Sequence, residues 1–201
     1  MKPCTWKPDQ YCVKREDRTC LVTAKVQDEE LYLEGFRQID PEALKLTASP
    51  AFEDEEVIRS AYRRFCSDPD RAFFVLKNED GKILGEAVIN DLDREKSEAN
   101  FRIALFTSTA RGHGTGTWMT EEVCRYAFEV MKLERLTLDV LQTNPRARKA
   151  YEKAGFVLDS SCEEEIVNIT GHPETVVFDF MVLDTENWKA MQKNHSGSSN
   201  R

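Results

Sequence analysis

Two short stretches of this sequence carry residue types and spacings that suit chemistry. The first begins at an arginine, has glycines at three alternate positions, and runs directly into a helical pattern that ends near Lys132. Glycines let the backbone adopt positive φ and approach a ligand closely, and the free amides at a helix N-terminus favour an anion. The stretch therefore predicts a pyrophosphate cradle. Its residues are Arg111, Gly112, His113, Gly114, Thr115, Gly116 and Thr117.

Spacing excludes two commoner phosphate-binding glycine loops. A Walker loop ends in Gly-Lys-Ser or Gly-Lys-Thr, and no lysine lies in this stretch. A dinucleotide fingerprint needs Gly-x-Gly-x-x-Gly, whereas the glycines here stand at every second position. For this stretch taken alone, a glycine-rich turn without function is the remaining alternative.

The second stretch, residues 144–156, predicts a short helix that presents a tyrosine. Asn144 suits the N-cap, a proline follows at the first helical position, and Gly155 supplies the left-handed residue that ends a helix. Small residues recur at helical spacing, and Tyr151 lies on their face, about two turns from Asn144. A tyrosine on this face either takes part in the chemistry of the site or is a buried residue that only packs.

Hydrophobic periodicity predicts the elements that position these two stretches. A first hairpin is expected over residues 20–26 and 31–36, with its second arm beginning the domain proper. The other expected strands are 72–76, 83–90, 99–105, 136–140, 156–168 and 175–183. The expected helices start at Asp40-Pro41-Glu42, span 53–66 and 115–132, and follow Asn144.

Length and composition bound the class of protein. A chain of 201 residues with 40% hydrophobic content suits one domain with a substantial core. No apolar run resembles a signal peptide or spans a bilayer, so we expect a soluble, cytoplasmic protein without a membrane partner. The net charge of −8 argues against nucleic acid as a partner. The six cysteines are scattered and match no zinc spacing, so we expect free thiols and no metal.

Together, the two stretches resemble the GNAT superfamily of N-acetyltransferases. The Arg-x-x-Gly-x-Gly pattern at 111–116 is similar to its acetyl-CoA loop, and residues 144–156 are similar to its Asn-x-x-Ala-x-x-x-Tyr-Glu-Lys-x-Gly-Phe segment. The resemblance covers roughly residues 30–183 and is greatest to the branch with ribosomal-protein N-terminal alanine acetyltransferases and spermidine N-acetyltransferases. It implies an α+β fold with a mixed, mostly antiparallel seven-stranded sheet flanked by helices. The expected division is an N-terminal extension (1–29), the acetyltransferase domain (30–186), and a C-terminal helix or disordered tail (187–201).

The resemblance also implies an activity and a set of binding residues. The activity is acetyl transfer from the co-substrate acetyl-CoA to a primary amine, either a peptide N-terminus or a small polyamine, by direct attack in a ternary complex. Main-chain groups at the end of the strand before the cradle would bind the pantetheine and the carbonyl. The implied binding residues are Leu105, Phe106, Thr107, the cradle residues 111–117, Asn144, Lys149 and Tyr151. Arg146, Arg148, Lys149 and Lys153 are candidates for the 3′-phosphate, or else a solvated helix face.

For acyl transfer, Tyr151 is the expected acid, and Asn144 is expected to orient the pantetheine arm or a water molecule. Two carboxylates are candidate general bases. Glu86 alternates with apolar residues, where desolvation would raise its pKa and make it a better base. Its alternative is an edge position that faces water. Glu98 is the acid nearest the start of the strand that enters the cradle, and we keep it as the second candidate.

Several alternatives stay open from the sequence. A chain that keeps the cradle without turnover would be a non-catalytic CoA-binding or assembly module. Residues 46–52 either contact the acceptor or form a plain connecting loop. The acidic residues 163–165 either attract a cationic acceptor or form a solvated strand face. The acceptor itself is undecided, and a homodimer is allowed.

Overall fold

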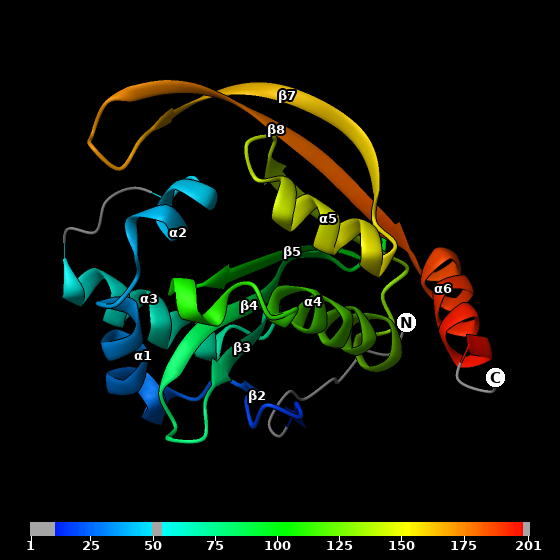
Figure 1. Cartoon of the computed structure of the whole chain (residues 1–201), viewed down its shortest axis with the longest axis horizontal. Helices are drawn as coiled ribbons and strands as arrows, with labels where there is room; N and C mark the ends of the chain where they lie inside the picture. Colours follow the sequence, from blue (N-terminus) through cyan, green and yellow to red (C-terminus); the bar gives the residue numbers. More distant parts are fainter. Residues whose placement is uncertain (1–10, 50–53, 199–201) are drawn as a thin grey trace.

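The computed structural model describes residues 11–49 and 54–198, and within these residues it forms one eight-stranded sheet with helices on both faces (Figure 1). The strands are β1 (Cys12–Lys14), β2 (Cys20–Thr23), β3 (Ala72–Lys77), β4 (Ile83–Asp93), β5 (Glu98–Leu105), β6 (Arg135–Leu141), β7 (Val157–Val167) and β8 (Pro173–Asp184). Their order in the sheet is β1-β2-β3-β4-β5-β6-β8-β7. Neighbouring strands are antiparallel except β5 and β6, which are parallel.

The helices fall where capping residues start them. Asp40 caps α2 by accepting a hydrogen bond from the Ala43 amide, and Asp54 caps α3 in the same manner. The helices are α1 (Glu29–Phe36), α2 (Pro41–Leu46), α3 (Glu55–Ser67), α4 (Thr115–Arg125), α5 (Pro145–Ala154) and α6 (Thr185–Ser198), and α4 continues as the π-helix η3 (Tyr126–Met131). None of the helices in the described ranges is long and apolar enough to span a bilayer.

The mixed α+β fold is confirmed, with a correction to the number of strands. The described sheet has eight strands rather than seven because β1 adds a short edge strand beside β2. Both strands lie within the range 1–29 that was expected to be an extension. The described cysteines are free thiols, and Cys4 lies outside the described residues, as do residues 50–52 of the expected acceptor contacts.

The expected strand over residues 31–36 is wrong, because this segment is helix α1. Tyr32 and Phe36 are four residues apart, and their rings pack with centroids 5.6 Å apart on one helix face. A run as short as Leu-Tyr-Leu fits a strand or a buried helix equally well. The two acids in its first turn, Glu29 and Glu30, favour the helix, and β2 pairs with β1 and β3 instead.

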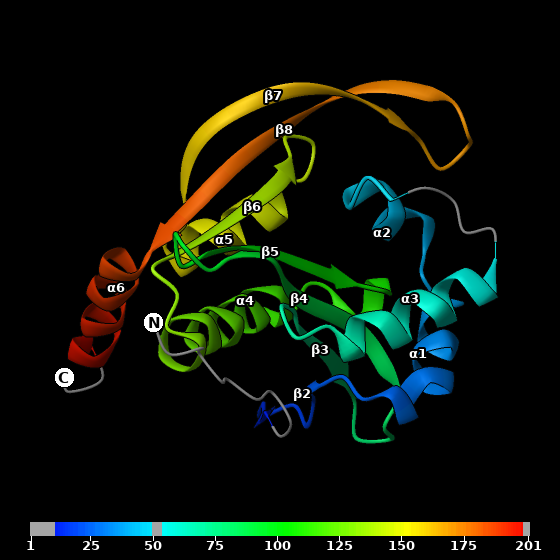
Figure 2. The same ribbon diagram turned by 180° about the vertical axis from the view of Figure 1, so that it is seen from behind.

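The sheet separates two apolar cores, and Figures 1 and 2 show from opposite sides the helices that cover them. One core lies under α4, η3 and α5 and takes Phe101, Ile103 and Leu105 from β5. The other lies under α1 and α3 and takes alternate strand residues such as Val88 of β4, together with Phe106, which follows β5. Each residue of β5 therefore belongs to one of two faces, and this division decides what each side chain can reach.

The last hairpin, β7 and β8, is a long arm that arches over α5 (Figure 1). Most of β7 is exposed, including Glu163, Glu164 and Glu165. At the base of the arm the chain enters α6, where Trp188 is buried and stacks on Phe128 with ring centroids 5.8 Å apart. Residues 185–198 are thus helical, and residues 199–201 lie outside the described ranges.

Candidate active site

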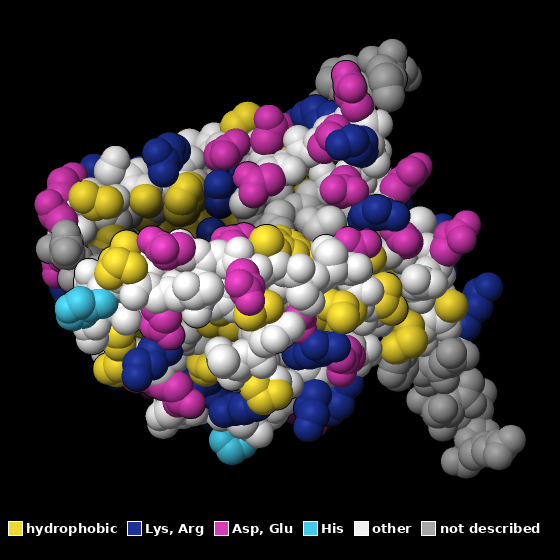
Figure 3. Space-filling view, turned by 90° about the horizontal axis from the view of Figure 1, so that it is seen from above, with side chains coloured by type: hydrophobic (Ala, Val, Ile, Leu, Met, Phe, Trp, Pro, Cys, Tyr) yellow, Lys and Arg dark blue, Asp and Glu magenta, His cyan; other side chains and the backbone are white. Residues whose placement is uncertain are grey.

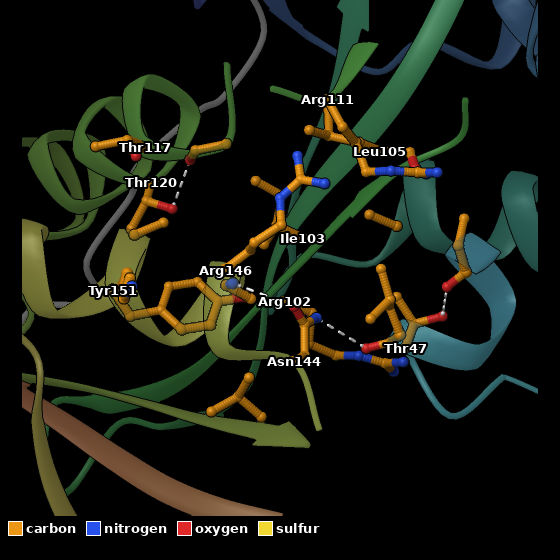
Figure 4. A pocket seen from close by; sticks show the side chains of 18 of the residues that line it. Thr47, Arg102, Ile103, Leu105, Arg111, Thr117, Thr120, Asn144, Arg146 and Tyr151 are labelled. Carbon is orange, nitrogen blue, oxygen red and sulfur yellow. Dashed lines mark hydrogen bonds between the residues drawn. The ribbon is translucent and has the colours of Figure 1, made fainter. Parts of the chain in front are cut away.

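A cavity of about 420 Å³ opens where β5 and β6 diverge. The two strands pair only over 98–100 and 135–137, and beyond that point β5 follows β4 while β6 follows β8. The gap is lined by the ends of both strands, by the loop and first turn of α4, by α5, and by α2 with the residues after it. Figure 4 shows side chains from these elements around the gap. A slot between splayed parallel strands suits an elongated ligand.

The cradle forms one end of the cavity. Gly112 and Gly114 have φ of +97° and +75°, the left-handed region that favours glycine. Gly114 caps α4, and the Trp118 amide donates the first hydrogen bond of the helix, to the Gly114 carbonyl, over 2.9 Å. The amides of Thr115, Gly116 and Thr117 precede that bond, so they have no acceptor within the helix. These amides and the two glycines line the cavity's anion-favouring end.

Arg111 lies in the cavity wall with its guanidinium already bound. It donates to both carboxylate oxygens of Asp40, at 3.0 and 2.8 Å, to Glu42 at 2.9 Å, and to the Leu105 carbonyl at 3.1 Å. Burial opposes ionisation of Asp40, yet the Ala43 amide and Arg111 together hold its pKa below the usual value. In this arrangement the Arg111 side chain ties the cradle to α2 and β5.

Arg15, which the sequence analysis left without a role, holds the other side of the cradle. It follows β1, and its guanidinium donates to Thr115 Oγ1 over 2.9 Å, to the His113 carbonyl, and to Asp17. It also lies 6.0 Å from the Trp118 ring centroid. His113 itself lines a neighbouring hollow rather than the main cavity. No local pattern could have identified this role of Arg15, because Thr115 and His113 are 100 and 98 residues away in sequence.

Tyr151 on α5 and Asn144 at the N-cap of that helix both line the cavity (Figure 4). Asn144 caps the helix by accepting from the Ala147 amide at 3.1 Å, and its Nδ2 donates to the Leu46 carbonyl at 3.2 Å. Tyr151 is 7% exposed, and its hydroxyl has no hydrogen-bond partner among the described residues. Burial, with a smaller effect of Asp139, raises the pKa of Tyr151, so the phenol stays protonated at neutral pH.

Glu86 reaches the cavity from β4, an interior strand paired on both sides. The Tyr32 hydroxyl on α1 donates to Glu86 Oε2 over 2.6 Å. Burial raises the pKa of Glu86 above its ordinary value, although this bond and the charges of Arg102 and Arg71 partly oppose the shift. Sequence reasoning missed Tyr32 because it placed this residue in a strand.

Other predicted residues are not brought to the cavity. Glu98 lies at the opposite end of β5, with its carboxylate 3.9 Å from Arg135. Phe106 is buried in the core under α1, and both its backbone groups are hydrogen-bonded, the amide to Leu84 and the carbonyl to Asp40. Thr107 Oγ1 is 2.9 Å from that of Thr109. Of the three residues at this strand end, only Leu105 lines the cavity.

The four cationic side chains on α5 do not all face the cavity. Arg146, Lys149 and Lys153 line the cavity, and a Cβ at Gly112 would lie 3.9 Å from the Arg146 guanidinium. Arg148 faces the other way, where it pairs with the fully buried Asp179 and with Glu152. Three of the four predicted cations are therefore placed to meet an anion that extends from the cradle.

Comparison with known proteins gives matches in both sequence and fold. Residues 18–157 match the family described as an acetyltransferase (GNAT) domain. The spermidine N(1)-acetyltransferase of Vibrio cholerae is 23% identical over 114 residues, which make up 57% of this chain and 65% of that protein, just under two thirds of its length.

Solved structures share the fold. A crystal structure of spermidine N-acetyltransferase from Vibrio cholerae, in complex with CoA and spermine, has a TM-score of 0.73 at 17% identity, covering 85% of this chain and 98% of that one. A GCN5-related N-acetyltransferase from Brucella melitensis has a TM-score of 0.73 at 14% identity, covering 95% and 86%.

Proposed function

Because the chain belongs to the GNAT acetyltransferase family, we propose that it transfers an acetyl group from acetyl-CoA to a primary amine by direct attack in a ternary complex. The observation that carries the proposal is the cavity between β5 and β6, with a cradle of free amides at one end and Tyr151 and Glu86 farther along it. The fold shared with a CoA-bound acetyltransferase supports the same reading.

Binding of the coenzyme falls to groups that suit each of its parts. The amides of residues 112–117 would hold the diphosphate, as a helix N-terminus holds anions. Arg146, Lys149 and Lys153 would meet the 3′-phosphate, because they line the same cavity without a described ion pair. Leu105 and Asn144 would border the pantetheine arm. Arg111 would act by fixing the cradle, since Asp40 and Glu42 already bind its guanidinium.

Acyl transfer requires proton donation as well as binding. The amine forms a bond to the acetyl carbon, the carbon–sulfur bond breaks, and the thiolate needs a proton. Tyr151 is proposed to donate it, because its phenol is protonated at neutral pH and its hydroxyl has no hydrogen-bond partner among the described residues. Asn144 holds α5 to the carbonyl of Leu46 and so keeps Tyr151 in place.

Glu86 is the proposed general base, oriented by Tyr32. An alkylamine of pKa ~10.4 is about 3.4 units from neutral at pH 7, a cost of roughly 4.6 kcal/mol, whereas an α-amine near 8 costs only about 1.4 kcal/mol. An alkylamine acceptor therefore needs the base far more than a peptide N-terminus does. If Glu86→Gln leaves the pH–rate profile of the preferred acceptor unchanged, Glu86 is not the base.

The test combines binding with turnover. Isothermal titration measures the affinity of the protein for CoA. A thiol-release assay measures acetyl transfer to spermidine, to an aminoglycoside and to a ribosomal-protein N-terminal peptide. Binding together with release for at least one amine supports the proposal. Binding without release for every amine favours a non-catalytic CoA-binding module, and no binding contradicts both.

A further inference from the structure

Arg102 is a cation in the cavity wall that the proposed mechanism does not use. It is exposed on β5, two residues past the last pair between β5 and β6, and it lines the same cavity as Glu86. No described residue forms a hydrogen bond or ion pair with it. An unpaired guanidinium that faces a binding cavity is available to a ligand.

The face that Arg102 occupies separates it from the coenzyme-binding groups. Its neighbours Phe101 and Ile103 pack under α4, on the cradle side of the sheet. Arg102 alternates with them and lies in register opposite Val88, whose side chain packs under α1 and α3. Tyr32, which contacts Glu86, belongs to this same core. Arg102 and Glu86 are therefore two opposite charges on the acceptor side of the gap.

The other cations of the cavity are already explained. Arg111 is neutralised by Asp40 and Glu42, and Arg146 extends from α5 toward the centre of the gap (Figure 4). Figure 4 shows Arg102 separately, near Thr47 on the α2 side. The carboxylates in the described lining are those of Glu86 and Asp139. A polyamine would thus find two carboxylates here, but it would also place an ammonium group near an unpaired guanidinium.

The face of the molecule above the arm does not change this balance of charge. Seen from above the arm of β7 and β8, Lys and Arg side chains are mixed with Asp and Glu, and no large patch of a single sign covers this face (Figure 3). Selection between acceptors of different charge therefore depends on the groups inside the cavity, where desolvation strengthens each interaction.

We infer that the acceptor is an amine that also bears a carboxylate, which pairs with Arg102 while the amine lies toward Glu86. This inference rests on the proposed acetyl transfer and narrows its substrate class. A guanidinium binds a carboxylate through two parallel N–H donors, a geometry that an ammonium group of a polyamine cannot satisfy. Thr47 and Ser49, which line the same end, supply hydroxyls for the polar parts of such an acceptor.

The experiment compares acceptors that differ only in the carboxylate. One set pairs ω-amino acids of increasing length with diamines of the same length, and another pairs Ala-Ala with its C-terminal amide. Thiol release gives kcat/KM for each member. We expect the carboxylate member of the accepted pair to be preferred, and Arg102→Gln to lower its kcat/KM by about 10- to 100-fold while leaving its uncharged or cationic counterpart nearly unchanged.

Arg146→Gln is the matched control, because it removes a cavity cation on the coenzyme side. It should raise the KM for acetyl-CoA and leave the preference between paired acceptors unchanged. A wild-type preference for diamines or amides, or an equal loss for both members in Arg102→Gln, overturns the inference while leaving acetyl transfer intact. Absence of release with every amine would instead contradict the proposed function, and the inference with it.

Discussion

The two halves of the cavity are built in different ways. The half that we propose for the coenzyme, hereafter the coenzyme half, has its diphosphate end made mainly of backbone, with two left-handed glycines and the first amides of α4 within contiguous residues 112–117. The half that we propose for the acceptor, hereafter the acceptor half, is made of side chains from separate elements, with Tyr32 from α1, Glu86 from β4, Arg102 from β5 and Thr47 after α2. The first half depends on local conformation, and the second depends on tertiary packing.

Because of this difference, the two halves tolerate different substitutions. A backbone cradle tolerates substitution of most side chains, but it fails when a residue cannot adopt positive φ. A side-chain pocket can exchange one charge for another without altering the fold, because Arg102 and Thr47 form no part of either core. We therefore expect coenzyme binding to respond to variants of the cradle glycines and of Arg15, and acceptor choice to respond to single charges.

The largest effect is expected at Tyr151, where the two halves meet. Tyr151→Phe removes the proposed acid and should lower kcat by on the order of 10² to 10⁴, with modest change in acetyl-CoA binding. The control is Tyr62→Phe, which removes a buried hydroxyl that donates to the Lys25 carbonyl at 2.9 Å and does not line the cavity. It should lower stability by about 1 kcal/mol and leave kcat alone. An unaltered kcat in Tyr151→Phe would show that Tyr151 only packs and donates no proton.

Gly114→Ala tests whether the cradle depends on backbone conformation. Its φ of +75° strains any L-residue, and distortion of the loop should weaken CoA binding by about 10- to 100-fold, measured by calorimetry. Gly81→Ala is the matched control, with φ of +80° in the turn between β3 and β4 and open space around its Cβ. Both variants should lose about 1 kcal/mol of stability. Equal CoA affinity in the two variants would argue against the cradle.

Arg15→Ala tests a smaller contribution to the same half. Loss of its hydrogen bonds to Thr115 and to the His113 carbonyl should loosen the loop and weaken CoA binding by about 2- to 10-fold. Arg18→Ala serves as control, since Arg18 lies in the same hairpin and forms only an exposed pair with Glu79. If the two variants bind CoA with equal affinity, the hydrogen bonds of Arg15 to the cradle have no role in CoA binding.

The smallest effect concerns stability in the acceptor half. Because burial raises the pKa of Glu86 in the folded state, folding favours the protonated carboxyl. The stabilising contribution of the protonated Glu86 carboxyl is fully present below the ordinary glutamate pKa. It is lost as pH rises through the raised pKa of Glu86 in the folded state. Glu86→Gln should remove this loss, so the variant should gain stability relative to wild type as pH rises, measured by urea unfolding. Parallel pH profiles of the two proteins would contradict the burial of that charge.

The same division explains what the sequence could predict. The cradle, α5 and the hairpin of β3 and β4 depend on local signals such as Gly114, Asn144 and Gly155, and the structure has these elements where expected. The segment 31–36 was placed in a strand because three apolar residues in a row fit either period, and that error hid Tyr32. Arg15 could not have been assigned, because its contacts with the cradle join distant segments. Arg102 could not have been assigned either, because only the tertiary structure shows that it lines the cavity.

The most direct measurement is a crystal structure of the protein with bound CoA. We expect the diphosphate to accept hydrogen bonds from the amides of residues 112–117 and the sulfur to lie beside the Tyr151 hydroxyl, between β5 and β6. A coenzyme bound elsewhere, or a sulfur atom remote from that hydroxyl, would contradict the proposed site.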